Sequence, residues 1–340
     1  MKILVPASLL LLLAGCSTQQ PDSSAKQPNT VGSIVRLDPA LDALIPPEAK
    51  IEKIASGFKF TEGPLWKPNG VLWFSDVVGN VVRQWSPDGK VVEILNPGGA
   101  DNPGYAPPGS FIGPNGMVMG KGGVVLLCQH GNRRIVQIGA DSKVSVFLDR
   151  WEGKRFNSPN DLVFSNDGAL YFTDPPYGLV KQDDDPTKEI KFNGVFRFAD
   201  GKVNPIIRDL TRPNGIAFSP DHKILYVGNT DEKRKIWMRY DVQPDGTVKN
   251  GRVFFDVTSE KEPGLPDGMK VDSRGNLYCS GPGGLWIFSP EGKHLGTIKP
   301  GETPANCAWG DSDFKTLYIT AETSVYRIKL AVEGEKGLYQ

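Results

Sequence analysis

Short apolar runs separated by turn residues recur along most of the chain. From Glu62 the sequence reads EGPLWKPNGVLWFSD, in which Pro-Asn-Gly separates two apolar runs. The stretches NDLVFSNDGALYFTD from Asn160 and DGMKVDSRGNLYCSG from Asp267 repeat that order around Asn-Asp-Gly and Ser-Arg-Gly. Two apolar runs joined by a turn of this composition predict a β-hairpin.

Each hairpin begins with one polar residue, which we call the lead residue. The six lead residues are Glu62, Asn115, Asn160, Asn214, Asp267 and Asn306, spaced 53, 45, 54, 53 and 39 residues apart. A third and a fourth apolar run follow most hairpins. Four short strands in each of six repeats predict an all-β fold, a six-bladed β-propeller with four-stranded blades. A pair of β-sandwiches is the competing architecture, but it does not explain so regular a spacing.

The start of the chain has the composition of a targeting segment. Residues 1–16, MKILVPASLLLLLAGC, join one Lys to an apolar run too short to span a bilayer, which predicts a signal peptide. Their last four residues, LAGC, resemble the bacterial lipobox, in which Cys16 is acylated. The alternatives are an ordinary signal with an incidental Cys, or a buried apolar helix. We therefore expect an exported bacterial lipoprotein at the periplasmic face, and Ser17 resembles the residue after the Cys in outer-membrane lipoproteins.

The polar residues that follow predict a tether between the membrane and a folded domain. Residues 17–33, STQQPDSSAKQPNTVGS, are rich in Ser and other polar residues and are expected to be flexible. Residues 34–340 then form a single propeller domain, in which 34–50 supplies strand or clasp material that closes the ring. Contact with the membrane is expected through the lipid anchor only.

Charge and cysteine content exclude several classes of protein. The chain has 39 Lys and Arg against 39 Asp and Glu and contains no basic run, so nucleic acid is not an expected partner. Apart from Cys16 there are three cysteines, Cys128, Cys279 and Cys307, without CxxC spacing. This count predicts buried free thiols rather than a zinc site or a disulfide framework, with one disulfide as the alternative. The oligomeric state is not indicated.

The lead residues are the candidate functional site. The inner strand of each propeller blade runs along the central channel, and each lead residue comes just before that strand. We therefore expect the six side chains to meet around one mouth of the channel. Two carboxylates and four amides, with no His or Cys, form an oxygen-rich set that suits calcium, and magnesium less well. The alternative is that these residues only cap strand ends.

Several motifs around the lead residues are similar to those of one family. FTEGPLW, NSPNDLVF, RPNGIAFSPD and LPDGMKVD resemble the four site motifs of the SMP-30/gluconolactonase family of six-bladed propellers, which includes regucalcin. CQHGNRRI, YFTDPPYG and KTLYIT resemble the bacterial gluconolactonase branch of that family. The resemblance covers nearly the whole chain after the tether, with the motifs in the family's order and spacing.

The resemblance implies roles for four lead residues. The family's metal ligands correspond to Glu62, Asn214 and Asp267, and Asp267 also corresponds to its catalytic acid/base. Asn160 corresponds to the Asn that contacts the substrate, and in some members this Asn lies close enough to touch the metal.

The chain departs from regucalcin-type members directly before Asn160. Ser158-Pro159 stands there in place of an Arg-Phe pair. Arg155-Phe156, three residues earlier, would have to reach the same space if the contacts to sugar hydroxyls are kept.

Further residues are expected around a substrate pocket beside the metal. Asn115 belongs to the lead residues, and Tyr177 lies with Asp174 in the loop TDPPYG, which we expect at the pocket rim. His130 ends the second strand of its blade and is expected to face the same mouth. It is either a structural histidine or, by likeness to paraoxonase-type propeller lactonases, a general base. Asp161 is expected to hold a turn.

These features predict a metal-dependent hydrolase that opens a sugar lactone such as a gluconolactone. The cation would polarise the carbonyl and a carboxylate would activate water. The alternatives are another ester or phosphotriester hydrolase on the same metal site, or a non-catalytic ligand-binding surface lipoprotein. Calcium is the expected cation, with magnesium, manganese and zinc left open, and the natural substrate is not indicated.

Overall fold

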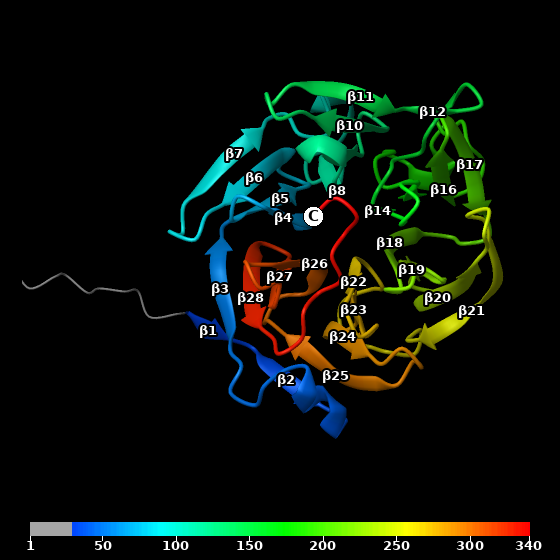
Figure 1. Ribbon diagram of the computed structural model, residues 1–340. Helices are drawn as coiled ribbons and strands as arrows, with labels where there is room; N and C mark the ends of the chain where they lie inside the picture. The colour runs from blue at the N-terminus through cyan, green and yellow to red at the C-terminus, as the bar shows by residue number, and fades with distance from the viewer. Residues whose placement is uncertain (1–28) are drawn as a thin grey trace, which may run out of the picture.

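Six antiparallel sheets surround a common axis in the computed structural model, which describes residues 29–340 (Figure 1). Each sheet is one blade, numbered here in the order of its inner strand. The predicted all-β six-bladed propeller with four-stranded blades is therefore confirmed. The predicted signal peptide, Cys16 and most of the predicted tether lie outside the described residues.

The strands of each blade follow one another from the axis outward. Blade 1 consists of β4 (Thr61–Lys67), β5 (Val71–Asp76), β6 (Val81–Trp85) and β7 (Val91–Leu95). Blade 2 consists of β8 (Pro114–Met119), β9 (Val125–Gln129), β10 (Arg134–Ile138) and β11 (Val144–Leu148). Blade 3 consists of β14 (Leu162–Phe164), β15 (Leu170–Asp174), β16 (Gly194–Ala199) and β17 (Lys202–Ile207). Blade 4 consists of β18 (Pro213–Phe218), β19 (Ile224–Asn229), β20 (Ile236–Val242) and β21 (Val248–Asp256). Blade 5 consists of β22 (Met269–Val271), β23 (Leu277–Gly281), β24 (Gly284–Phe288) and β25 (His294–Lys299). Blade 6 consists of β26 (Pro304–Gly310), β27 (Thr316–Ala321), β28 (Ser324–Lys329) and β3 (Ile51–Ser56).

The ring is closed by chain segments from both ends of the described region. Strand β3 precedes blade 1 in the sequence but pairs with β28 as the outer strand of blade 6. Strand β2 (Ser33–Arg36) pairs with β25 of blade 5, and β1 (Thr30–Val31) pairs with β3. Residues 34–36 of the predicted clasp do form a strand, but the clasp also includes residues 51–56 and begins at residue 30, within the predicted tether.

Burial decreases from the inner to the outer strand of a blade. All seven residues of β26 are buried, whereas most of β21 is exposed. Neighbouring blades pack through aromatic side chains, as where Trp66 of blade 1 stacks on Tyr318 of blade 6 with ring centroids 5.1 Å apart. Cys128, Cys279 and Cys307 are buried and free.

Helix is confined to short 3-10 turns in residues 29–340. They are η1 (Pro39–Ala43), η2 (Pro103–Tyr105), η3 (Lys121–Gly123) and η4 (Gln182–Asp184), and the remaining short strands are β12 (Arg150–Trp151) and β13 (Lys154–Arg155). Within this described part of the chain, no helix has the length and apolar character needed to cross a membrane.

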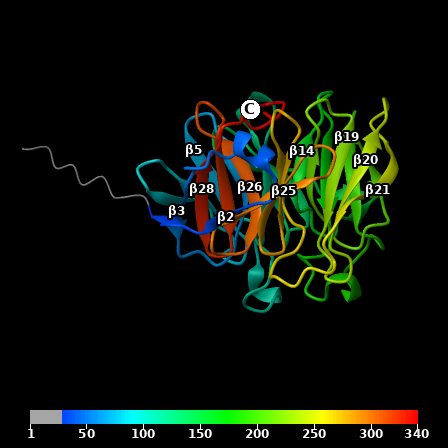
Figure 2. The same cartoon turned by 90° about the horizontal axis from the view of Figure 1, so that it is seen from below.

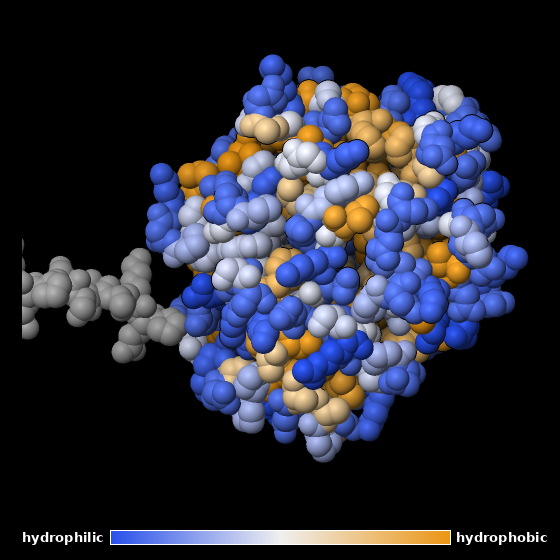
Figure 3. All heavy atoms as spheres, in the orientation of Figure 1, coloured by the Kyte–Doolittle hydropathy of each residue, from blue (hydrophilic) through white to orange (hydrophobic). Residues whose placement is uncertain are grey.

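The C-terminal segment covers one mouth of the central channel. After β28 the chain returns across the axis, and Figures 1 and 2 show its end on the face opposite η2. It is held by a bridge between Asp272 and Gly334 and by the ring of Tyr339, which lies edge-on to Phe164 at 5.0 Å. Figure 3 shows this face covered mainly by hydrophilic residues, with hydrophobic ones in small groups. The candidate site opens on the other face.

Candidate active site

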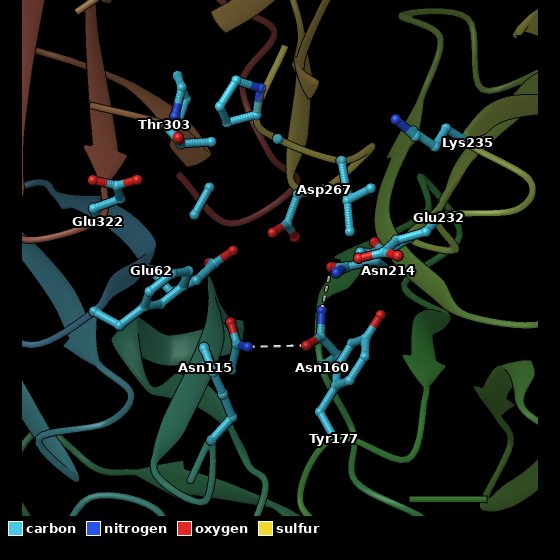
Figure 4. Close-up of a pocket in the computed structure, with 18 of the residues that line it drawn as sticks. Glu62, Asn115, Asn160, Tyr177, Asn214, Glu232, Lys235, Asp267, Thr303 and Glu322 are labelled. Atoms are coloured by element: carbon cyan, nitrogen blue, oxygen red, sulfur yellow. Dashed lines mark hydrogen bonds between the residues drawn. The ribbon is translucent and has the colours of Figure 1, made fainter. Parts of the chain in front are cut away.

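A cavity of about 810 Å³ occupies the open mouth of the channel. Five of the six lead residues line it, in agreement with the expected convergence: Glu62, Asn115, Asn160, Asn214 and Asp267 (Figure 4). The sixth, Asn306, does not line the cavity but lies behind Glu62, to which its side chain donates a hydrogen bond of 3.0 Å.

Local irregularities in the inner strands direct these side chains to the mouth. The pairing of β4 with β5 shifts register between Glu62 and Leu65, and that of β18 with β19 shifts between Pro213 and Ile216. A bulge of this kind bends a strand and changes the direction of its side chains. Glu62 and Asn214 are thus the second residues of their strands, aimed at the cavity rather than alternating with the sheet.

Glycines after the lead residues bring neighbouring blades into close contact. A Cβ on Gly63 would lie 2.1 Å from the carbonyl oxygen of Asn115, and one on Gly215 would lie 2.2 Å from that of Asp267. No other residue leaves space for this approach. Each glycine therefore allows the lead residue of its own blade to lie beside the lead residue of the next blade.

A chain of amide hydrogen bonds runs along one side of the cavity. Asn115 Nδ2 donates to Asn160 Oδ1 at 2.9 Å, and Asn160 Nδ2 donates to Asn214 Oδ1 at 2.5 Å. All three side chains are buried. The oxygen of Asn115 is also buried and has no hydrogen-bond partner, so the amide chain has an acceptor that is not satisfied within the protein.

The two lead carboxylates lie on the other side of the cavity and destabilise each other's charge. Burial, with the negative charge of Asp161, raises the pKa of Glu62 to about 7, against hydrogen bonds from Gly63 and Asn306. Burial, followed by the charge of Glu62, raises the pKa of Asp267 well above its usual range. Two like charges in a site with little water favour either protonation or a bound cation.

His130 is part of the amide network. Its Nδ1 lies 3.0 Å from the carbonyl oxygen of Phe111, which can only accept a hydrogen bond. The proton of the neutral ring is therefore on Nδ1, and Nε2 is an acceptor. Nε2 then accepts a hydrogen bond from Asn115 Nδ2 at 3.2 Å, and in this tautomer it does not donate to Asn160 Oδ1, which lies 3.0 Å away. Burial lowers the pKa of His130 to about 4, so the ring is neutral at neutral pH. Both ring nitrogens have protein partners, and a general-base role would require one of these contacts to break.

The wall above the amides is aromatic. Phe60 and Phe111 meet edge to face with centroids 4.9 Å apart, and both line the cavity together with Tyr177. Burial raises the pKa of the Tyr177 hydroxyl, which therefore remains a hydrogen-bond donor. Charged side chains, among them Glu232 and Lys235, also line the cavity (Figure 4).

Two expectations about segments near Asn160, namely Asp174 and Arg155-Phe156, are wrong. Asp174 is not at the rim: it is fully buried and accepts hydrogen bonds of 2.8 Å from the backbone N–H groups of Asn157 and Ser158. It thereby anchors the loop that leads to Asn160. Arg155-Phe156 does not reach the cavity, because Phe156 is buried among other aromatic rings and the Arg155 guanidinium donates to the carbonyl of Asn132.

As expected, Asp161 does not line the cavity, but it has a neighbour that the sequence did not indicate, Lys270. Asp161 is buried and faces the channel behind the lead residues, and Lys270 lies 4.0 Å from it. A signal was present: Gly follows Glu62, Asn115, Asn214 and Asp267, whereas an acid follows Asn160.

The site differs from a site built on His, Cys, Asp and Glu alone. Across residues 29–340, no three side chains of these four types are grouped so as to hold a metal ion. Any cation at the channel mouth would therefore depend on amide oxygens as well as on the two lead carboxylates.

Fold and cavity together define a six-bladed propeller with an acid- and amide-lined pocket at one mouth. The family model described as the SMP-30/Gluconolactonase/LRE-like region matches residues 60–323. A gluconolactonase from Zymomonas mobilis is 42% identical over 318 residues, covering 90% of this chain and 88% of that protein. A regucalcin from Xenopus laevis is 28% identical over 280 residues, covering 80% and 86%. The solved structure of a gluconolactonase from Xanthomonas campestris superposes with a TM-score of 0.76 at 30% identity, covering 89% of this chain and 96% of that one.

The chain therefore belongs to the SMP-30/gluconolactonase/LRE-like family. The predicted family and the predicted class, a gluconolactonase-like enzyme, are confirmed.

Proposed function

We propose that the protein hydrolyses a sugar lactone, such as a gluconolactone, at the cavity lined by the lead residues. The observation that carries this proposal is the pair of carboxylates, the buried Glu62 and the partly exposed Asp267, facing the same cavity as three amides. The 42% identity to a gluconolactonase over nearly the full length of both proteins supports the substrate class.

One divalent cation fits the residues present. Glu62, Asn214 and Asp267 would hold it, because their donors are oxygens and the two carboxylates match its charge. Oxygen donors in a site of flexible geometry favour calcium over zinc or magnesium. The mutual repulsion of Glu62 and Asp267 is what such an ion would relieve. When bound, the ion would polarise the lactone carbonyl and stabilise negative charge on its oxygen.

The remaining steps rest on the chain's own groups. Asp267 would take a proton from the attacking water, and a bound cation would lower its pKa so that it is ionised for this role. Asn160 and Asn115 would orient the lactone, with His130 holding their amides in place. The Tyr177 hydroxyl would donate a hydrogen bond to the substrate from the aromatic wall.

The test is hydrolysis of a panel of lactones, simple esters and phosphotriesters, each with and without chelator. Cation-dependent hydrolysis of sugar lactones, faster than that of the other two classes, is expected. Preference for a phosphotriester or an open-chain ester would mean that the substrate belongs to that class and is not a sugar lactone. Binding of a lactone without turnover in the presence of calcium, magnesium, manganese or zinc would mean a non-catalytic ligand-binding protein.

We also propose that the enzyme acts outside the cytoplasm as a lipoprotein. The support is the lipobox-like LAGC ending at Cys16, followed by a polar stretch long enough to separate the propeller from a membrane.

A further inference from the structure

A charged pair lies in the channel directly behind the lead residues. Asp161 precedes β14 of blade 3, and Lys270 is the central residue of β22 in blade 5. The Asp161 side chain is 4% exposed; its Oδ1 accepts from the N–H of Leu162, and its Oδ2 has no hydrogen-bond partner. Lys270 Nζ lies 4.0 Å from that unpartnered oxygen. The proposed mechanism uses neither group.

The pair is connected to the proposed cation ligands through Asn306. Lys270 Nζ lies 3.5 Å from Asn306 Oδ1, and Asn306 Nδ2 donates to Glu62 Oε2 at 3.0 Å. The electrostatic effect reaches both lead carboxylates. The charge of Asp161 raises the pKa of Glu62 and of Asp267, and the charge of Lys270 lowers the pKa of Glu62.

The formal charges in this part of the channel do not cancel and leave a net negative charge. With a cation bound and the carboxylates ionised, Glu62, Asp161 and Asp267 would contribute three negative charges and Lys270 one positive charge, a net formal charge of minus two. His130 is neutral, and Glu232, Lys235 and Glu322 lie out along the cavity, where solvent and salt screen them. The Lys270 side chain is 31% exposed, but Asp161 and Glu62 are buried, and an uncompensated charge on them is costly. The net charge of minus two therefore favours one divalent cation.

We propose that Lys270, paired with Asp161, sets the charge of the site to that of one divalent cation. This inference rests on the proposed function, because it concerns the same cation. Lys270 is not a ligand; it is a positioning residue that offsets the third carboxylate and holds Asn306 against Glu62. If Lys270 only filled the channel, replacing it would change stability but not the preference among cations of different charge.

The experiment measures calcium and terbium binding by calorimetry to wild type, Lys270→Gln, Asp161→Asn and the double variant. Lys270→Gln should raise calcium affinity by about tenfold and terbium affinity by more, because the energy scales with the charge of the ion. Asp161→Asn should lower calcium affinity by a similar factor. The double variant restores a net charge of minus two and should lie within about threefold of wild type.

Lys223→Gln is the matched control. It removes the same charge from a side chain that is 80% exposed in the turn before β19 and pairs with Asp221, and it should leave both affinities unchanged. Should Lys270→Gln fail to fold, Lys270→Met keeps the aliphatic stem, and Asp161→Asn alone must still weaken binding.

The outcomes separate the inference from the proposed function. If wild type binds no calcium and hydrolyses lactones in chelator, the cation-dependent function is wrong. If wild type binds calcium but the two single variants shift affinity in the same direction, or not at all, only the role of Lys270 is wrong. An unchanged ratio of terbium to calcium affinity in Lys270→Gln would also overturn that role.

Discussion

Glu62 and Asp267 are both carboxylates, but their different surroundings suit them to different roles. Glu62 is buried and accepts hydrogen bonds from Gly63 and Asn306, whereas Asp267 is partly exposed to the cavity and lies beside the Asn214 side chain. Glu62 therefore suits a ligand role alone. Asp267 lies beside Asn214 on the wall of the cavity, which suits it to act on water as well.

Substitution of these two carboxylates should have different consequences for catalysis. Glu62→Gln keeps the size of the side chain and removes one unit of ligand charge, so lactone hydrolysis should recover at least in part at high cation concentration. Asp267→Asn also removes the base, so the rate should stay about two to four orders of magnitude below wild type at any cation concentration. Rates are measured against calcium concentration. Full recovery by Asp267→Asn would make Asp267 only a ligand and transfer the base role to His130 or to cation-bound water.

The pKa of Glu62 predicts a pH dependence of stability in chelator. A carboxyl group whose pKa is raised in the folded state, from 4.5 to about 7, keeps its proton longer when folded than when unfolded. Its contribution is fully present below pH 4.5 and is lost as pH rises to about 7. The unfolding free energy should therefore fall across this range, by up to about 1.4 kcal/mol per pH unit.

Glu62→Gln is the control for this pH dependence. Denaturant unfolding of the variant in chelator should show a shallower fall between pH 4.5 and about 7, with the remainder due to Asp267 and other acids. Equal slopes for both proteins would mean that Glu62 does not carry a raised pKa.

At the scale of elements, the site depends on how closely the inner strands approach one another. The bulges turn the lead side chains toward the mouth, and the glycines allow the backbones of adjacent blades to meet. Neither feature supplies a chemical group. Both determine whether the groups of different blades are close enough to share one ligand.

Gly63→Ala should therefore disturb both fold and site. Gly63 has φ of 50°, and its new Cβ would lie 2.1 Å from the Asn115 carbonyl oxygen, so blades 1 and 2 must separate. Gly70→Ala is the matched control, because Gly70 has φ of 82° and has nothing within 4 Å of its Cβ position. Denaturant unfolding should show a loss of about 1 kcal/mol for Gly70→Ala and a loss at least twice as large for Gly63→Ala. Calcium affinity should fall only in Gly63→Ala, and equal effects of the two variants would contradict the close-approach explanation.

At the scale of the whole molecule, the two ends of the described chain have different tasks. The N-terminal strands β1 to β3 close the ring against blades 5 and 6, and the C-terminal segment covers the mouth opposite the cavity. The cavity lies at the mouth away from the C-terminal segment, whose place on one face of the ring is seen in Figure 2.

Cys16→Ser tests the proposed anchoring. Stable attachment to a membrane requires two or more acyl chains, which Cys16 would carry after processing. The variant should be recovered in the soluble fraction or as an unprocessed precursor, with the lactonase activity of the folded domain unchanged. Ser17→Thr is a nearby control that should leave the membrane fraction as in wild type. Membrane partitioning that is equal in Cys16→Ser and wild type would rule out a lipid anchor on this residue.

Sequence patterns alone were enough to predict the repeat, the blades and five residues that line the cavity. Turn composition and apolar runs are local properties, and the regular spacing of Glu62, Asn115, Asn160, Asn214 and Asp267 gave their equivalent places in the ring. Only the tertiary structure decided the contacts that depend on ring closure. Asn306 lies behind Glu62 because blade 6 packs against blade 1 when the ring closes, and Asp161 of blade 3 meets Lys270 of blade 5 inside the channel. Such contacts arise from the packing of whole blades, and no periodicity within one repeat encodes which side chains will face each other across the axis.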